Sequence, residues 1–200
     1  MDWTGLLHLG DLSLTLPLGA ALAAWLLAAR AWRSALGWSL LLACALGLVG
    51  ASKIAFIGWG GGVPALGFKA ISGHAAGATA VFPLLFFLLL QRHGAQLRAA
   101  GVGAGLGVGA LVAVLLVAAG EHTAVETLAG WTTGAAASLG GVKLAEGVAV
   151  PPALTGAAAM LLVFGAVAWL MKSAPISYWM IRAAMLLSGN LRPYSLYGIH

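Results

Sequence analysis

The chain has 200 residues, of which 62% are hydrophobic and 8% are charged, and its mean hydropathy is +1.00. Soluble domains carry roughly 25% charged residues, so this composition excludes a water-soluble fold and predicts an α-helical membrane protein. The net charge of +5 is spread among loops and is not interleaved with aromatic residues, which argues against a nucleic-acid-binding protein.

Apolar runs divide the chain into six segments that we expect to cross a membrane. They are predicted at residues 13–29, 35–57, 72–90, 101–119, 122–142 and 153–171. No loop between them is long enough to hold a second domain, so residues 1–200 are expected to form a single domain with its core at 13–171.

The tail, residues 172–200, contains the apolar stretch ISYWMIRAAMLL with a lone Arg182. It is too short and too broken for a seventh span, and it predicts an interfacial helix followed by an irregular end. The expected fold class is therefore all-α: a polytopic bundle of six transmembrane helices with a C-terminal interfacial segment.

Glycines recur every fourth residue in the fourth run, at Gly101, Gly105 and Gly109. This spacing places them on one helical face and predicts close approach of a neighbouring helix. Gly103 and Gly107 suggest that the other side of this helix is close-packed as well.

The six-span layout brings polar residues from distant parts of the sequence to one side of the membrane. These are Lys53, Lys69, Ser72, His74, His122 and Glu126. The opposite side collects Arg30, Arg33, Arg92, Arg98 and Lys143, and the positive-inside rule makes that side cytoplasmic. Richness in Ala, Leu and Gly indicates a bacterial gene, so we expect a multi-pass protein of the bacterial inner membrane whose polar patch faces the periplasm.

The polar patch has the chemistry of an anion site. Ser72, Gly73 and His74 stand where a loop meets a helix, and a helix N-terminus offers unpaired N–H groups to an anion. Lys53 and Lys69 add positive charge. His122 and Glu126 are four residues apart, so the carboxylate can hold one imidazole nitrogen protonated and leave the other free. Two histidines and an anion cradle suit phosphoryl transfer.

At these residues the sequence resembles the type 2 phosphatidic acid phosphatase family of membrane lipid phosphatases, whose motifs are KxxxxxxRP, PSGH and SRxxxxxHxxxD. Lys53 matches the first motif's lysine, Ser72-Gly73-His74 the end of the second, and His122 and Glu126 the histidine and acid of the third. The resemblance implies a metal-independent phosphoric monoester or lipid pyrophosphate hydrolase that needs no cofactor.

The resemblance also implies a role for each residue. His122 would be the nucleophile that forms a phosphohistidine, Glu126 would orient it, and His74 would be the general acid. The remaining residues would hold the phosphate: Lys53, Ser72, Gly73 and, beside them, Lys69. The implied substrate is a lipid phosphate or a polyprenyl phosphate or pyrophosphate whose acyl or prenyl chain lies in the bilayer.

Both motif arginines are replaced in this chain. The first motif's Arg-Pro falls on Gly60 and Gly61, the second motif's proline on Ile71, and the third motif's arginine on Leu116. Three explanations stay open. Lys69 supplies part of the lost charge, the tail folds back and lends Arg182 or Arg192, or the site binds a phospholipid without hydrolysing it efficiently.

The same residues allow two interpretations other than a phosphatase. His122, Glu126 and His74 could instead ligate a metal ion. The glycine-rich fourth span and the missing arginines also suit a degenerate phospholipid-binding protein, a small transporter or an accessory subunit of a membrane complex.

Overall fold

The computed structural model describes residues 3–149 and 153–194, and these residues form helices joined by short connections. The elements are η1 (Trp3–Gly10), α1 (Leu12–Ala28), α2 (Trp32–Trp59), η2 (Pro64–Leu66), α3 (Gly73–Leu89), α4 (Ala95–Ala118), α5 (Ala124–Ala145), α6 (Ala153–Lys172) and α7 (Ile176–Ser188). Within the described ranges the only β pairing is an isolated bridge between Val63 and Phe68. The prediction of an all-α fold is confirmed.

Each predicted run coincides with one helix, with small shifts at the ends. The largest consequence is at α5, which begins at Ala124 and not at His122, because Thr123 is the N-cap and its side chain accepts from the backbone of Glu126. The tail forms the helix predicted for it, α7, Ile176–Ser188. The irregular end predicted after this helix is present at residues 189–194, which form no helix, and residues 195–200 lie outside the described residues.

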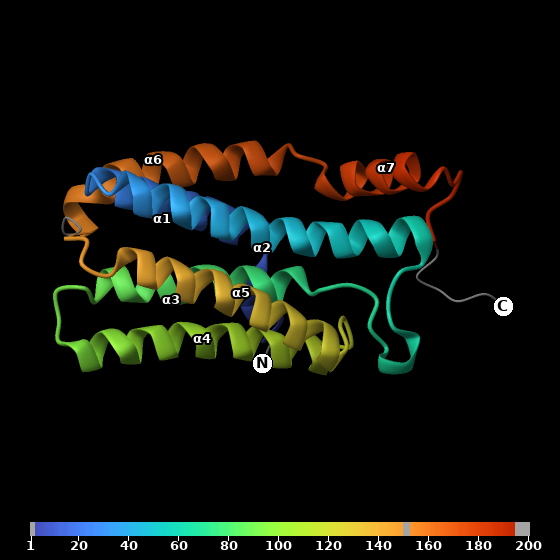
Figure 1. Cartoon of the computed structure of the whole chain (residues 1–200), viewed down its shortest axis with the longest axis horizontal. Helices are drawn as coiled ribbons and strands as arrows, with labels where there is room; N and C mark the ends of the chain where they lie inside the picture. The colour runs from blue at the N-terminus through green and yellow to red at the C-terminus, as the bar shows by residue number, and fades with distance from the viewer. Residues whose placement is uncertain (1–2, 150–152, 195–200) are drawn as a thin grey trace.

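The long helices run along one common axis, with α3 between α4 and α5 (Figure 1). α1 packs against α6 along one half of the bundle, and α7 packs against α2. The turns α1–α2 and α3–α4 lie at the left end in Figure 1, and the end of α2 and the starts of α3 and α5 lie toward the right.

Small residues let α4 and α5 approach α3 closely. A Cβ placed on Gly105 would lie 2.4 Å from the nitrogen of Pro83, and one on Gly109 would lie 2.0 Å from Thr79 Oγ1. Both distances are far below van der Waals contact, so only glycine fits. The predicted packing face of α4 is therefore confirmed.

The second expectation for α4 is wrong. A Cβ on Gly103 or Gly107 would meet nothing within 4 Å, so that side of α4 is not close-packed against another part of the described chain. The other tight contact of α3 is with α5, where a Cβ on Gly130 would lie 2.4 Å from the carbonyl oxygen of Ser72. Close packing of α3 on two sides makes it the centre of the bundle.

Helix length and composition support a membrane protein. Two described helices, α2 with 28 residues and α4 with 24, are long and apolar enough to cross a membrane alone. α6 and α7 pass the same test only as a pair bent by 59°, while α1 and α3 are shorter apolar helices. Large apolar side chains are exposed on the outer faces, as expected for contact with lipid, among them Leu36, Leu40, Leu48, Leu111, Val114, Leu161 and Leu162.

Candidate functional site

His122 and Glu126 form a hydrogen-bonded pair at the start of α5. Nδ1 of His122 lies 2.8 Å from Oε2 of Glu126. The Glu126 side chain is 5% exposed and that of His122 is 20% exposed. A carboxylate at Nδ1 favours the tautomer that carries its proton there, so Nε2 keeps its lone pair. The pairing predicted from the four-residue spacing is present, although His122 precedes the helix and does not lie within it.

Glu126 also holds the local backbone together. Its Oε1 accepts from the Lys69 N–H at 2.8 Å, and its Oε2 accepts from the Thr123 N–H at 3.1 Å. The second bond completes a capping box with the Thr123 side chain. Its backbone oxygen accepts from the Ser72 N–H at 3.1 Å. This network fixes the start of α5 against the segment that leads into α3.

Lys53 lies beside the N-terminus of α3. Its Nζ would be 3.6 Å from a Cβ built on Gly73, the first residue of that helix. The positive end of a helix dipole repels a cation, so a lysine here indicates a place for an anion between them. The negative charge of Glu126 also attracts this amine.

Ser72 is the N-cap residue of α3. It is fully buried, and its side chain caps α3 by accepting from the N–H of Ala75 at 3.5 Å. A Ser72 hydroxyl in this position cannot reach an anion in a surface pocket. Gly73, the next residue, has room above it because its nearest neighbours are the Val49 side chain and Lys53 Nζ.

A pocket of about 790 Å³ lies next to the His122–Glu126 pair. Its polar wall contains His122, Glu126, Lys53, Lys69 and Glu121, and its remaining lining is Phe56, Ile57, Ala70, Gly120, Thr123, Ile181, Pro193 and Tyr194. The structure therefore gathers both predicted lysines, the predicted nucleophile and its carboxylate on one cavity.

His74 makes a different contact from the one expected. Its Nε2 lies 2.8 Å from Oδ1 of Asp11, and the other oxygen of Asp11 lies 2.7 Å from Nδ1 of His8. His74 is not among the residues that line the pocket of His122. It comes from the first turn of α3 but turns toward η1, because Asp11 precedes α1 there and offers a carboxylate.

Sequence reasoning missed Asp11. The only signal was its rarity, since the chain has five acidic residues in all. No group of three or more His, Cys, Asp and Glu in the described ranges has the geometry to hold a metal ion. His74 is therefore not placed as the third ligand of the metal set considered from the sequence.

One explanation for the missing motif arginines was that the tail folds back and supplies one. The tail does fold back to the pocket, but the side chains that it brings there are apolar. Ile181, Pro193 and Tyr194 line the cavity. Arg182 instead donates to the hydroxyl of Tyr178 at 3.3 Å and stacks over its ring. No arginine from the described part of the chain lines this pocket.

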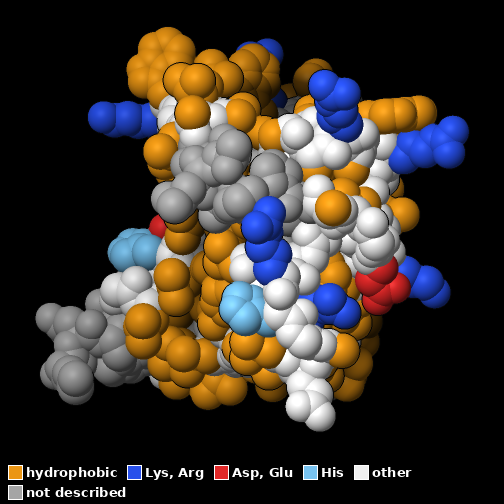
Figure 2. Space-filling view, turned by 90° about the vertical axis from the view of Figure 1, so that its left-hand side faces the viewer, with side chains coloured by type: hydrophobic (Ala, Val, Ile, Leu, Met, Phe, Trp, Pro, Cys, Tyr) orange, Lys and Arg blue, Asp and Glu red, His pale blue; other side chains and the backbone are white. Residues whose placement is uncertain are grey.

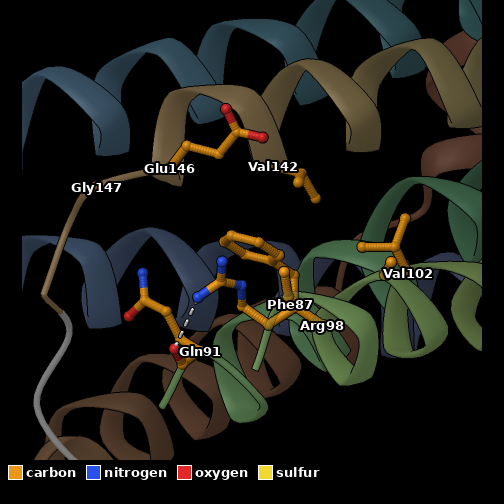
Figure 3. Close-up of a pocket in the computed structure, with 9 residues that line it drawn as sticks. Phe87, Gln91, Arg98, Val102, Val142, Glu146 and Gly147 are labelled. Carbon is orange, nitrogen blue, oxygen red and sulfur yellow. Dashed lines mark hydrogen bonds between the residues drawn. The ribbon is translucent and has the colours of Figure 1, made fainter. Parts of the chain in front are cut away.

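A second pocket of about 620 Å³ lies at the opposite end, between α3, α4 and α5 (Figure 3). Figure 2 views this end and shows Lys and Arg side chains at several points among hydrophobic ones. Arg98 donates to the carbonyl oxygen of Gln91 at 3.4 Å, and the Gln91 amide donates to the carbonyls of Ala145 and Val148. These contacts satisfy carbonyl groups at helix C-termini, and they make this pocket a structural junction.

The chain is similar to a protein of Klebsiella pneumoniae named "Uncharacterized 22.5 kDa protein in cps region". The two are 37% identical over 139 residues, which cover 69% of this chain and 66% of the relative. The chain thus spans just under two thirds of that relative's length. No family model matches the chain, and no solved structure matches it.

Proposed function

We propose that the chain is an integral-membrane lipid phosphatase that removes a phosphate from a lipid phosphate or pyrophosphate through a phosphohistidine on His122. The single observation that carries this proposal is the buried Glu126 carboxylate holding Nδ1 of His122 at 2.8 Å on a pocket that two lysines also line. The pair supplies a nucleophilic nitrogen, and the lysines supply charge for a phosphate.

The reaction has two steps. Nε2 of His122 attacks phosphorus, a P–N bond forms, and the P–O bond to the leaving lipid oxygen breaks while that oxygen takes up a proton. Water then attacks the phosphohistidine, the P–N bond breaks, and inorganic phosphate leaves with His122 restored. Glu126 stabilises the imidazolium character that develops at Nδ1 in the first step.

The phosphate would be held by Lys53 and Lys69 together with the first-turn N–H groups of α3 at Gly73. This arrangement resembles a helix-terminus anion site with a lysine added. A bound anion would offset the repulsion between Lys53 and the positive end of the α3 dipole. Ser72 supports it by capping α3. His74 is the proposed proton donor, and it must exchange its Asp11 bond for a place near the leaving oxygen during the reaction.

We further propose that α1 to α6 all cross a bacterial inner membrane, with the basic end cytoplasmic and the His122 pocket periplasmic. The test is labelling of intact cells with a membrane-impermeant maleimide, after the lone Cys44 is replaced by serine. Ala65→Cys, at an exposed position of η2 in the connection between α2 and α3, should be labelled from outside. Gly94→Cys, in the α3–α4 turn, should be labelled only after the membrane is opened. The reverse pattern, or equal labelling of both, contradicts the proposed orientation.

The activity test is phosphate release from long-chain lipid phosphates and pyrophosphates by purified chain. Wild type should release phosphate, and His122→Ala should reduce the rate to background. His93→Ala, an exposed histidine in the α3–α4 turn, is the matched control and should retain full activity. A phosphoenzyme trapped on wild type should be acid-labile and absent from His122→Ala.

The absence of an arginine from the described pocket lining favours one alternative, a protein that binds a phospholipid without hydrolysing it. The same experiment separates the two. Binding of lipid phosphate that is weakened by Lys53→Gln, with no phosphate release from any lipid, would establish the binding protein and exclude the enzyme.

A further inference from the structure

The C-terminal segment, Ile176–Tyr194, returns to the end of α2 after a sharp bend. α6 and α7 are inclined by 59° at the break between them, and α7 packs along the last part of α2 (Figure 1). Gly58 permits this contact, because a Cβ there would lie 3.1 Å from the carbonyl oxygen of Ala184. Ala184 is the one fully buried residue of α7.

The chain beyond α7 is then tied to the last turn of α2. The Asn190 side-chain amide donates to the carbonyl of Gly58 at 2.6 Å, and the Tyr194 N–H donates to the carbonyl of Ile57 at 2.7 Å. The Tyr194 ring meets the edge of Phe56 at a centroid distance of 5.9 Å. Three independent contacts therefore hold this segment in place.

The Tyr194 ring packs directly against Gly60. The φ of +66° at Gly60 favours glycine, and a Cβ there would lie 2.7 Å from the ring. Gly60 is also the position that matches the arginine of the first phosphatase motif. The tail thus occupies space that a side chain at this position would need.

The same segment gives the His122 pocket an apolar side. Ile181 and Tyr194 line it together with Phe56 and Ile57, opposite the polar wall of Lys53, Glu126 and His122. Ile181 is 36% exposed and Tyr194 is 52% exposed, so both have free apolar surface toward a ligand. One cavity therefore combines a site for an anion with a surface for hydrocarbon.

The position of this cavity suits a lipid. α2 has 28 residues, which corresponds to about 42 Å at 1.5 Å per residue against a hydrocarbon core of about 30 Å. The end of α2 and α7 therefore lie at the membrane boundary, where exposed Tyr178, Trp179 and Leu186 of α7 fit an interfacial helix.

We propose that the segment Ile176–Tyr194 is part of the substrate site, and that Ile181 and Tyr194 bind the hydrocarbon next to the phosphate of an anionic lipid. The inference rests on the proposed function for the place of the phosphate. It makes the tail the element that discriminates long-chain lipid phosphates from water-soluble phosphate esters. Each methylene buried there should strengthen binding about fourfold.

The test measures binding of three probes to the purified full-length chain: dioleoyl phosphatidate in mixed micelles, dibutanoyl phosphatidate and inorganic phosphate. Ile181→Ala and Tyr194→Ala should weaken binding of the dioleoyl lipid about 5- to 50-fold and change binding of the other two less than twofold. Leu191→Ala is the control within the same segment, since Leu191 is 92% exposed and does not line the pocket.

A second variant moves the Tyr194 ring without substituting it. Gly60→Ala displaces the Tyr194 ring without altering a residue that lines the pocket, and it should reproduce the selective loss of long-chain binding. Equal losses for all three probes, or no loss for the dioleoyl lipid, overturn the inference.

The two proposals fail separately. Phosphate release from dioleoyl and dibutanoyl phosphatidate with the same KM, in wild type and in the tail variants, keeps the phosphatase and overturns the role of the tail. Binding that depends on chain length and on Tyr194, without phosphate release, supports the tail and removes the phosphatase.

Discussion

The two ends of the bundle carry similar polar residues and use them in opposite ways. At the basic end, Arg98 and Gln91 donate to carbonyl groups where α3 and α5 finish. At the other end, Lys53 lies at the start of α3, and Glu126 is shared between His122 and the backbone N–H groups of Lys69 and Thr123. At the basic end the polar side chains pair with backbone carbonyl groups, whereas at the other end a lysine amine lies beside a helix N-terminus, whose dipole disfavours a cation.

This difference separates a structural junction from a candidate binding site. Arg98 donates to the carbonyls of Gln91 and His93, and Glu126 completes a capping box at the N-terminus of α5, so neither contact needs a ligand. Lys53 lies beside the N-terminus of α3, where the helix dipole disfavours a cation, and only the charge of Glu126 offsets this within the chain. His122 lines the same cavity, so this end is the candidate site. The comparison predicts that substitutions at the two ends have different effects.

The largest effect is expected from Glu126→Gln. Glutamine has one acceptor oxygen, so it cannot accept from both Lys69 and Thr123, and it no longer fixes the proton on Nδ1 of His122. We expect kcat to fall by about 10²- to 10⁴-fold and thermal stability to fall as well, because one backbone N–H loses its acceptor. Glu146→Gln, in the pocket at the basic end, is the matched control and should leave kcat unchanged. Equal effects of the two substitutions would remove the distinction between the ends.

A smaller effect is expected from His74→Asn. If His74 leaves Asp11 to protonate the leaving oxygen, kcat should fall by about 10²-fold, and a lipid pyrophosphate with its better leaving group should be less affected than a lipid monophosphate. Asp11→Asn tests the resting contact and should alter activity far less. Unchanged kcat in His74→Asn, with lowered thermal stability, would assign His74 to anchoring η1 only.

The smallest effect on turnover is expected from Lys53→Gln. Loss of one charge-assisted contact should weaken phosphate binding by about 10- to 100-fold and appear mainly in KM. Arg98→Gln at the basic end should lower thermal stability, because carbonyls of Gln91 and His93 lose a donor, and leave KM unchanged. A KM effect for Arg98→Gln would show that the basic end also contacts substrate.

Much of this description follows from local sequence patterns. The apolar runs predict the helices because their length and composition are properties of each segment alone. Gly101, Gly105 and Gly109 predict a packing face because helical period fixes which residues share a side. The contact of His122 with Glu126 was predicted from their four-residue spacing and is present, although His122 precedes α5 and the contact forms around the N-cap.

Other features depend on which distant segment fills a space. Nothing in the sequence near His74 indicates its partner Asp11, which is 63 residues away. The His74 side chain turns to Asp11 and not to the pocket because η1 packs beside the start of α3. The start of α5 is a different case, because Thr123 and Glu126 have the T-x-x-E spacing of a capping box and this local signal was overlooked in placing the start at His122. Gly103 and Gly107 have the same spacing as the packing glycines but face no neighbour in the described chain.

The sequence by itself determined an all-helical, apolar chain with one imidazole–carboxylate pair and two lysines near predicted helix ends. These features follow from composition or from residues a few positions apart in the chain. Only the tertiary structure decided that Lys53 reaches the start of α3, that His74 turns to Asp11, and that Tyr194 covers Gly60. These contacts join segments far apart in sequence, and their geometry depends on how closely glycine and alanine let the helix backbones approach.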